Sequence, residues 1–527
     1  MMSGHARRLW LATSLLALAT AGCGTTVPLQ GQGPAGAVSS DGLSAPAGST
    51  LPGARGAAPG SPGAPSVTGT GQSSEGTTTP AQQSGASSLG QPARGVGNGR
   101  TEVTGPGVTA TTITIGLVYI TNSEAADKAF GANGITNGDD QADVKAVVDN
   151  INKNGGVAGR KLVILPYGED GTSAQPYAVT AQQMCTFMTQ DHKVLAVILG
   201  GSLGDPEATK ACLNKAGTAE FDGKTLGLMD SDDRSQIDFS IAGMNMDRSV
   251  LAAMKAWTIG NWYSPWNTAT GSPDPQGTFK MGILTEDDPA IVHAVHKVLL
   301  PALARAGHRP PAPQDIVTLH EPSSAGDDGA VLADIQNAVL KFRQDRVTHV
   351  LVTDSNGSAT LFFANDAYSQ HYYPRLGGGT GNAFQTLMET GNIQQKSLGG
   401  AVGAGWIPVI DLPYNGSANK YESPAAAHCR ALMNAAGQTF TSANPESVAL
   451  GYCDGLTELA TALNRASALT AIGLAQGAET IGRSLPSALT GGLDIAPGHH
   501  DAAGAFYANV YNNSCRCFQY RGARQLV

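Results

Sequence analysis

"VVDNINKNGGVAGRKLVILPYGED" (Val147–Asp170) carries the clearest fold signal in this sequence. Its first half has the apolar spacing of a helix, and its second half alternates like a strand. The paired glycines Gly155 and Gly156 can adopt the positive φ that ends a helix, and Gly159 suits a tight turn. A helix that leads through a short turn into a strand is the building unit of a parallel sheet, so the stretch predicts α/β construction.

Runs of the same kind lie on both sides of this stretch. "TITIGLVYI" (Thr112–Ile120) is typical of a strand, and "VLAVILGG" (194–201) is typical of a buried parallel strand. A second series begins at "FKMGILTEDD" (279–288) and includes "VTHVLVTDSNG" (347–357). Two series predict an α/β fold with two doubly wound lobes. Ligands of such sheets bind beyond the carboxyl ends of the strands, which here means the cleft between the lobes.

The N-terminus predicts export. Residues 1–22 combine a basic start with the apolar run "LWLATSLLALA" and small residues before Cys23, which resembles a bacterial lipoprotein signal peptide. Cys23 is then the lipidated first residue of the mature protein. Thr20 stands where that pattern usually has leucine, so a plain secretory signal cleaved nearby is the alternative.

Residues 23–110 are rich in Gly, Ala, Ser, Pro and Thr. Such a segment buries too little apolar surface to offset its ordering entropy, so we expect a flexible tether. A glycosylated stalk is the alternative. No later stretch reaches 18 consecutive apolar residues, which places the rest of the chain outside the membrane.

Charge and cysteine content narrow the expected partners and the expected cellular compartment. The chain has 42 acidic and 33 basic residues, a net charge of −9, and no Lys/Arg block, so nucleic acid is not an expected partner. The six cysteines after Cys23 suit an oxidising compartment. We expect the pairs Cys185–Cys212 and Cys429–Cys453, each in successive helical segments. Cys515 and Cys517 would need a strained C-x-C bridge, and their pairing stays open. A zinc site is the alternative use of these cysteines, but the sequence lacks a C-x-x-C or H-x-x-x-H frame for it. No metal and no other cofactor is expected.

The ordered series resembles the type I periplasmic solute-binding proteins of the branched-chain amino acid and amide type. The opening stretch is similar to the family's "iN..GGi.G..l.l...D", and the match covers essentially all of 111–527. The other matching segments are "ITIGLVYITNS", "VLAVILGGSLGD", "FKMGILTEDDPAIVHAV", "HVLVTDSNGSATLFFANDA" and "VALGYCDGLTELATALNRA".

The resemblance implies three hinge crossings between the lobes, near Ala242–Arg248, Gly400–Pro408 and Gly491–Pro497. It assigns 111–243 and 402–491 to lobe 1, and 244–401 and 492–527 to lobe 2. The tail "GAFYANVYNNSCRCFQY" is then expected to return to lobe 2 as a closing strand or hairpin.

In function, the resemblance implies a lipid-anchored, monomeric protein on the extracytoplasmic face of the cell membrane. It would capture a small polar solute (an amino acid, an amide or a related carboxylate) for an ABC-type permease, with no enzymatic activity. A sensory binding protein without transport would have the same sequence features.

"GGSLG" (Gly200–Gly204) is the main candidate ligand segment in lobe 1. Glycines let a backbone approach a ligand, and N–H groups at a helix N-terminus favour an anion. The resemblance implies that Gly200, Gly201 and Ser202 hold a carboxylate. Tyr119 and Thr121 follow the first strand and are expected to face the same cleft. An ordinary strand end and turn is the alternative.

Lobe 2 offers acidic and small residues after its strands. The candidates are Asp287, Asp288, Asp354, Ser355, Gly379, Thr380 and Trp406. Amino-acid binders of the family have an acid at the place of Gly379, so its absence puts an α-amino acid ligand in doubt unless Asp354 substitutes. The acids at 286–288 have a second interpretation as a solvated helix N-terminus. Trp406 has one as a packed hinge aromatic.

A hydrolase is the rival from another class. "GGSLG" also fits G-x-S-x-G between a strand and a helix, and Asp354 and His499 or His500 follow in the order of an α/β-hydrolase triad. Ser202 would then be the nucleophile of a lipid-anchored esterase. No His-Gly-type oxyanion segment precedes Ser202, and this hypothesis leaves the second α/β series unexplained. Metal binding by His499 and His500 is not expected, since adjacent strand side chains point to opposite faces.

Overall fold

A computed structural model describes residues 104–129, 131–223, 237–241, 243–320, 322–416, 419–490 and 492–527 of the chain. The predicted signal peptide, Cys23 and the predicted tether up to residue 103 lie outside the described residues. The end of the tether differs from expectation, because residues before 110 already contact the folded part. The N–H of Gly105 donates to the carbonyl of Leu469 at 2.7 Å, and Val108 forms a β-bridge with Ile113.

The first sheet has five strands, all parallel, in the order β2-β1-β3-β4-β5. Its strands are β1 (Thr112–Thr121), β2 (Lys161–Asp170), β3 (Ala196–Leu199), β4 (Ala219–Asp222) and β5 (Asp238–Ser240). The residues of β3 are buried throughout, as expected for a central parallel strand that is covered on both faces.

The second sheet has seven strands in the order β14-β13-β12-β11-β10-β8-β9. Five of them run parallel, and the C-terminal pair β13 and β14 adds an antiparallel hairpin at one edge, which confirms the predicted return of the tail. A small antiparallel pair, β6 with β7, lies outside this sheet. The strands are β6 (Trp266–Asn267), β7 (Ser272–Pro273), β8 (Met281–Glu286), β9 (Ile316–Leu319), β10 (His349–Val352), β11 (Arg375–Gly379), β12 (Val402–Gly405), β13 (Ala505–Asn512) and β14 (Cys517–Leu526).

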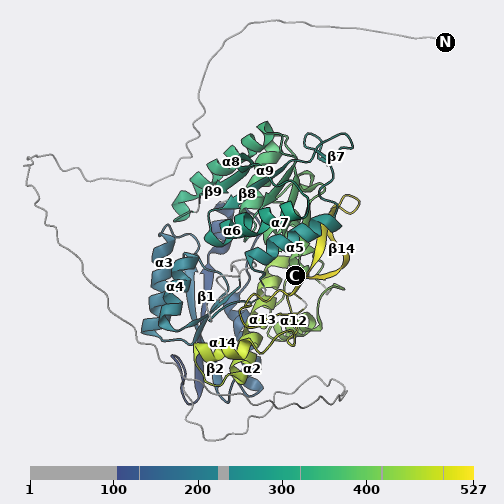
Figure 1. Cartoon of the computed structure of the whole chain (residues 1–527). Helices are drawn as coiled ribbons and strands as arrows, with labels where there is room; N and C mark the ends of the chain where they lie inside the picture. Colours follow the sequence, from purple (N-terminus) through teal and green to yellow (C-terminus); the bar gives the residue numbers. More distant parts are fainter. Residues whose placement is uncertain are drawn as a thin grey trace, which may run out of the picture. The chain divides into compact units, whose positions relative to one another are not determined.

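Helices cover both sheets (Figure 1). On the first sheet, α3 packs beside α4, α2 packs against α12 and α13, and α14 contacts β4. On the second, α5 packs on β11, β12 and β13, and α8 packs beside α9. Among the helices of the described residues, none combines the length and the apolar composition of a membrane span. The helices are α1 (Ser123–Ala129), α2 (Asp140–Lys153), α3 (Tyr177–Thr186), α4 (Pro206–Ala216), α5 (Met246–Ile259), α6 (Pro289–His293), α7 (Leu300–Arg305), α8 (Asp328–Gln344), α9 (Ser358–Ser369), α10 (Phe384–Glu389), α11 (Pro408–Asp411), α12 (Pro424–Ala435), α13 (Ala443–Arg465) and α14 (Ala471–Ala478).

The predicted passage from helix to strand in the stretch Val147–Asp170 is confirmed. Helix α2 ends at Lys153 and β2 begins at Lys161, where it pairs in parallel with β1. Gly155, Gly156 and Gly159 all have positive φ, at 108°, 73° and 75°. A Cβ at Gly156 would lie 2.0 Å from the carbonyl oxygen of Arg160, so the turn excludes any side chain there.

Within the described residues the chain passes three times between the layers of the two sheets. The first two crossings lie within the predicted ranges and the third lies later, but the predicted lobe boundaries at residues 402 and 492 are both too early. The sequence predicts lobe 1 from residue 402, whereas β12 (Val402–Gly405) belongs to the seven-stranded sheet. It also predicts lobe 2 from residue 492, whereas Ile495 bridges to Gly482 and Asp501 bridges to β5. The first crossing lies between β5 and α5, where Asp501 accepts hydrogen bonds from the N–H of Asn245 (2.8 Å) and from Arg248 (2.5 Å).

All six cysteines after Cys23 form disulfides. Cys185–Cys212 joins α3 to α4 and Cys429–Cys453 joins α12 to α13, with Cα–Cα distances of 6.3 and 6.1 Å, as predicted. Cys515 and Cys517, whose pairing the sequence leaves open, bond to each other in the turn between β13 and β14.

The segment between α1 and α2 connects the two halves of the fold. Ala132 is buried in the apolar cluster that contains Phe384 and Leu387, next to the seven-stranded sheet. Asn133 and Asn392 exchange two hydrogen bonds, of 2.8 Å and 2.9 Å. This segment of the first layer therefore contacts the second layer in the structure.

Candidate functional site

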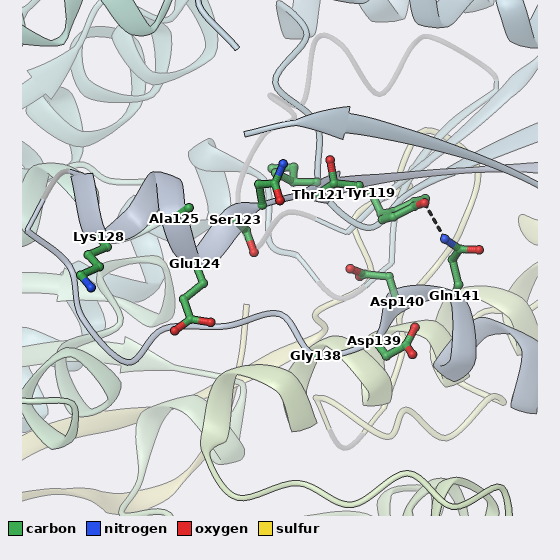
Figure 2. A pocket seen from close by; sticks show the side chains of 12 residues that line it. Tyr119, Thr121, Ser123, Glu124, Ala125, Lys128, Gly138, Asp139, Asp140 and Gln141 are labelled. Carbon is green, nitrogen blue, oxygen red and sulfur yellow. Dashed lines mark hydrogen bonds between the residues drawn. The ribbon is translucent and has the colours of Figure 1, made fainter. Parts of the chain in front are cut away.

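A pocket of about 680 Å³ opens at the carboxyl end of β1. Its walls come from the last residues of β1, the first turns of α1 and the start of α2, so three elements of one layer form it (Figure 2). Tyr119 and Thr121, two of the predicted ligand residues, lie in its wall. The position agrees with the rule that parallel sheets bind ligands at the carboxyl ends of their strands.

Polar contacts hold the inner wall in place. The amide of Gln141 donates to the Tyr119 hydroxyl at 2.5 Å, and Figure 2 shows the two side chains pointing toward each other. Behind them, the Tyr452 hydroxyl of α13 donates to Asp140 at 2.5 Å. Burial raises the pKa of Asp140, and the hydrogen bond from Tyr452 partly opposes this shift.

The pocket is acidic. Glu124, Asp139 and Asp140 line it, and Lys128 is the basic residue of its lining within the described ranges. Asp139 caps α2 by accepting from the N–H of Ala142 at 3.0 Å. One turn further along α2, Asp143 is completely buried, and neither of its oxygens has a hydrogen-bond partner in the described part of the chain. Burial, together with Asp140 and Asp139, raises the pKa of Asp143 to about 7.

The loop "GGSLG" is already occupied by a carboxylate of the chain itself. Glu169, near the end of β2, is 4% exposed and accepts hydrogen bonds from the Leu203 N–H (2.6 Å) and the Ser202 hydroxyl (3.1 Å). The Ser202 hydroxyl also accepts the N–H of Gly204 at 3.0 Å. These groups are the ones that the sequence predicts for a solute carboxylate, so the structure gives them an internal partner instead.

Gly200 faces a side chain rather than the pocket. A Cβ there would stand 1.8 Å from the Tyr452 hydroxyl oxygen and 2.7 Å from its ring, and Tyr452 is 2% exposed. Gly201 likewise faces Ile120, at 3.3 Å from a Cβ to the side chain. The close approach of the chain's own side chains explains both glycines without a ligand.

We therefore expect Gly200→Ala to destabilise the protein by about 1–3 kcal/mol, because the buried Tyr452 must move away from Asp140. Thermal unfolding measures the change. Gly329→Ala in α8 is the matched control, since a Cβ at Gly329 meets no atom within 4 Å. Equal melting temperatures for the two variants would contradict this account of Gly200.

The structure does not bring the predicted acids of the second layer to this pocket. Asp288 caps α6 by accepting from the N–H groups of Ala290 (2.7 Å) and Ile291 (3.1 Å). This contact agrees with the alternative interpretation of the acids at 286–288 as a helix N-terminus. Asp287 is exposed beside it.

Asp354 is 1% exposed, and both of its carboxylate oxygens accept hydrogen bonds from backbone N–H groups, including that of Thr360 at 2.7 Å. Its predicted role as an ammonium ligand is not supported by this geometry. Ser355, beside it, is half-buried.

Gly379, Thr380 and Trp406 belong to a separate packed region. The Thr380 hydroxyl donates to buried Asp411 at 2.9 Å and accepts the N–H of Trp406 at 2.9 Å. A Cβ at Gly379 would lie 3.2 Å from the ring of Trp406. Trp406 is 2% exposed and lines a second cavity of about 170 Å³. It is thus a packed aromatic at the second crossing, in line with its alternative interpretation.

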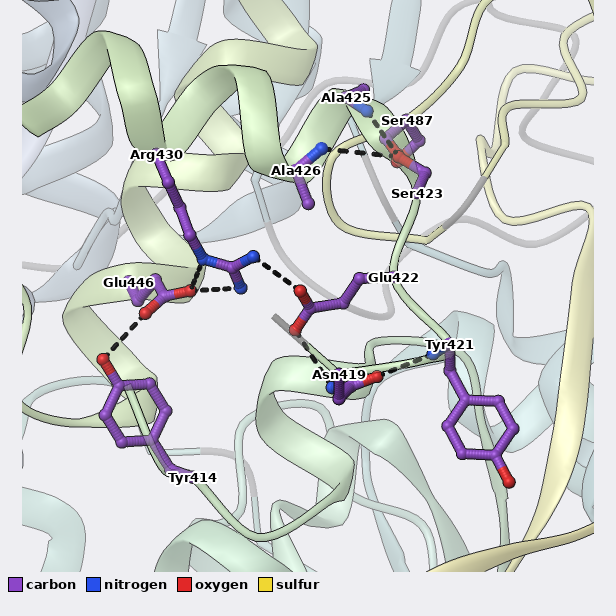
Figure 3. Close-up of polar contacts among 10 residues, drawn as sticks. All are labelled: Tyr414, Asn419, Tyr421, Glu422, Ser423, Ala425, Ala426, Arg430, Glu446 and Ser487. Atoms are coloured by element: carbon purple, nitrogen blue, oxygen red, sulfur yellow. Dashed lines mark hydrogen bonds and ion pairs between the residues drawn. The ribbon is translucent and has the colours of Figure 1, made fainter. Parts of the chain in front are cut away.

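Ionic contacts fix the chain beside this second cavity (Figure 3). Arg430 of α12 forms ion pairs with Glu422 and Glu446, and the Tyr414 hydroxyl donates to Glu446 at 2.7 Å. Figure 3 shows the guanidinium between the two carboxylates, which ties the segment after the second crossing to α12 and α13.

The three members of the rival hydrolase triad have other partners. Ser202 contacts Glu169, and Asp354 caps the α9 turn. His500 contacts Asp238 and Glu479, at 3.0 and 3.2 Å. His499 lies 2.8 Å from Asp501. Among these described residues, the Ser202 hydroxyl therefore forms no hydrogen bond with His499 or His500.

Several residues of the pocket are missing from the sequence prediction. For Asp139, Asp140 and Gln141 the signal is an acidic helix start soon after the first strand, a pattern that by itself indicates only a helix N-terminus. Glu169 had a weaker signal, because only the three-dimensional fold brings the end of β2 to the loop after β3.

Solved structures resemble the fold across most of the chain. They include a possible leucine/isoleucine/valine-binding protein from Rhodopirellula baltica (14% identity, 78% of this chain and 97% of that chain covered, TM-score 0.54). A periplasmic binding protein type 1 from Bordetella pertussis matches similarly (14% identity, coverage 78% and 100%, TM-score 0.53). So does a fatty acid ABC transporter substrate-binding protein from Thermomonospora curvata (15% identity, coverage 81% and 94%, TM-score 0.53). No protein-family model matches the sequence, and comparison with curated protein sequences finds no match.

Proposed function

We propose, from its type I periplasmic binding protein fold, that this protein captures a small polar solute outside the cytoplasm for an ABC-type permease. The observation that carries the proposal is the 680 Å³ polar pocket at the carboxyl end of β1, in a fold of two layered sheets joined by three crossings. The structures it resembles bear names that describe leucine/isoleucine/valine and fatty acid binding, which supports solute capture as a class of function.

The proposed cellular location of the protein rests on its N-terminal sequence. A lipid on Cys23 anchors the mature chain to the extracytoplasmic face of the cell membrane, and residues 24–103 tether the solute-binding part. The disulfides support an oxidising compartment for the described part. The protein acts as a monomer, without a cofactor, and the energy of transport comes from the permease.

Capture works by a shift between open and closed forms. A solute that contacts both layers stabilises the closed form by its extra contacts there. The α1–α2 segment supports this coupling, because it begins at the pocket wall and contacts the second layer through Ala132 and Asn133.

The test measures ligand binding by the full chain in detergent. Calorimetry and thermal unfolding detect the binding of small amines, amides, amino acids, carboxylates and sugars. A solute at 100 times its Kd stabilises the folded form by about 2.7 kcal/mol. We expect one chemical class to give a saturable shift, and Gln141→Ala to weaken it by releasing Tyr119. The control is Asp149→Asn, an exposed position of α2 that pairs with Lys145.

A blank result for every class would contradict the proposal. Two alternatives have their own readouts. Ester hydrolysis that disappears in Ser202→Ala would favour the hydrolase. Solute binding without association with a permease would favour a sensory role.

A further inference from the structure

We infer that the pocket at the end of β1 takes a cationic organic solute without a carboxylate, such as an amine, rather than an α-amino acid or an organic acid. The inference rests on the proposed function and names the ligand class of the same pocket. Three features of the structure support it: the occupied carboxylate position, the charge of the lining and the buried Asp143.

The first feature is that the anion-binding groups next to the pocket are used internally. Glu169 accepts from the Leu203 N–H at 2.6 Å and from the Ser202 hydroxyl at 3.1 Å. It is 4% exposed, so a solute carboxylate cannot reach these donors without displacing a buried side chain. A second carboxylate at this place would also meet the charge of Glu169, which disfavours both being ionised.

The second feature is an excess of negative charge with few compensating cations. Glu124 comes from α1, and Asp139 and Asp140 come from α2, so acids stand on two sides of the pocket (Figure 2). The side chains of Glu124 and Lys128 form no hydrogen bond or ion pair with another described residue, and the Lys128 carbonyl accepts the N–H of Gly131 at 3.1 Å. Outside the lining, Asp170 accepts from the side chain of the pocket residue Asn122 at 3.1 Å and adds another negative charge nearby. A cleft lined by one sign of charge attracts ligands of the opposite sign.

The third feature is independent of the lining and lies directly behind it. Asp143 is completely buried, with neither oxygen hydrogen-bonded in the described ranges, and a Cβ on the pocket residue Gly138 would stand 4.0 Å from its Oδ2. The ionisable groups that face Asp143 are Asp139 and Asp140 of its own helix and Tyr452 of α13. None of them supplies positive charge, so a cation in the pocket would be the compensating partner.

Tyr119 suits the same ligand class. Its ring lies in the pocket wall, and its hydroxyl is oriented by Gln141. The face of an aromatic ring attracts ammonium groups, and this attraction adds to that of the carboxylates.

The experiment compares solutes that differ by one group. Isoamylamine is leucine without its carboxylate, and 4-methylpentanoate is leucine without its amine. Agmatine and arginine form a second matched pair. Calorimetry on the full chain in detergent is expected to show at least one amine binding more than 10-fold tighter than the matched amino acid, and no binding of 4-methylpentanoate. Asp139→Asn combined with Asp140→Asn is expected to weaken amine binding at least 10-fold, whereas Asp149→Asn leaves it unchanged.

A gain-of-binding variant strengthens the test. Glu169→Ala vacates the Leu203 N–H and the Ser202 hydroxyl, so we expect leucine or 4-methylpentanoate to gain affinity relative to the wild type. Leucine or 4-methylpentanoate binding the wild type as tightly as the amine would overturn the ligand class and leave solute capture standing. Failure of both amines would overturn the inference as well, and the broader solute panel would then decide the proposed function separately.

Discussion

Arg375→Met is expected to lower the free energy of unfolding by about 3–5 kcal/mol, a larger loss than we expect for Gly200→Ala. Arg375 begins β11 and is 7% exposed. Its guanidinium donates to the Ser264 hydroxyl at 2.7 Å and to four backbone carbonyl groups, those of Gly260, Asn261, Trp262 and Gly400. Methionine fills much of the volume but removes the guanidinium donor from all of these acceptors, of which the Asn261 carbonyl keeps a hydrogen bond from the Ser264 hydroxyl at 3.0 Å.

The same guanidinium lies over the ring of Trp266, with 5.3 Å between Cζ and the ring centroid. Burial lowers the pKa of Arg375 to about 10, so it remains positively charged at neutral pH. Denaturant unfolding measures the loss. Arg309→Met is the matched control, because Arg309 is exposed and forms no hydrogen bond or ion pair in the described part of the chain. A loss below about 1 kcal/mol for Arg375→Met would show that water replaces the lost donors.

The fold was largely predictable from the sequence, because it depends on local patterns. The helix that ends at Lys153 and the positive φ of Gly155 and Gly156 follow from apolar spacing and paired glycines. The disulfides Cys185–Cys212 and Cys429–Cys453 follow from successive helices. The crossings were harder to place, since a short glycine-rich strand such as β12 has no hydrophobic pattern that separates one sheet from another.

The site was less predictable, because its chemistry depends on contacts between distant residues. "GGSLG" has the sequence of an anion-binding loop, but the sequence cannot show that Glu169 of a different strand fills it. Gly200 suggested a ligand approaching the backbone, whereas the approaching group is Tyr452 from α13. The acids of α2 have the sequence pattern of a helix start, and only the pocket beside them indicates a second role.

Asp143→Asn is expected to stabilise the protein at pH 8 and to have little effect near pH 4. The pKa of Asp143 is about 7 in the folded protein against an ordinary value of 3.8, so the folded state holds a proton that the unfolded state releases between these values. Its contribution to stability is therefore fully present below about pH 3.8 and is lost as the pH rises through about 7. Asparagine does not ionise, so the variant avoids this loss.

The expected gain at pH 8 is about 1–3 kcal/mol, after allowance for solvent in the adjoining pocket that screens part of the charge. Denaturant unfolding of both proteins from pH 4 to pH 8 measures it, with Asp149→Asn on the exposed side of α2 as the control of equal charge change. A gain that does not depend on pH would show that Asp143 stays ionised throughout. If the pocket binds a cation, the same substitution weakens that binding, because the solute loses the buried negative charge behind Gly138. The buried acid that lowers stability in the unfolding experiment would then serve solute binding, because the bound cation supplies its partner.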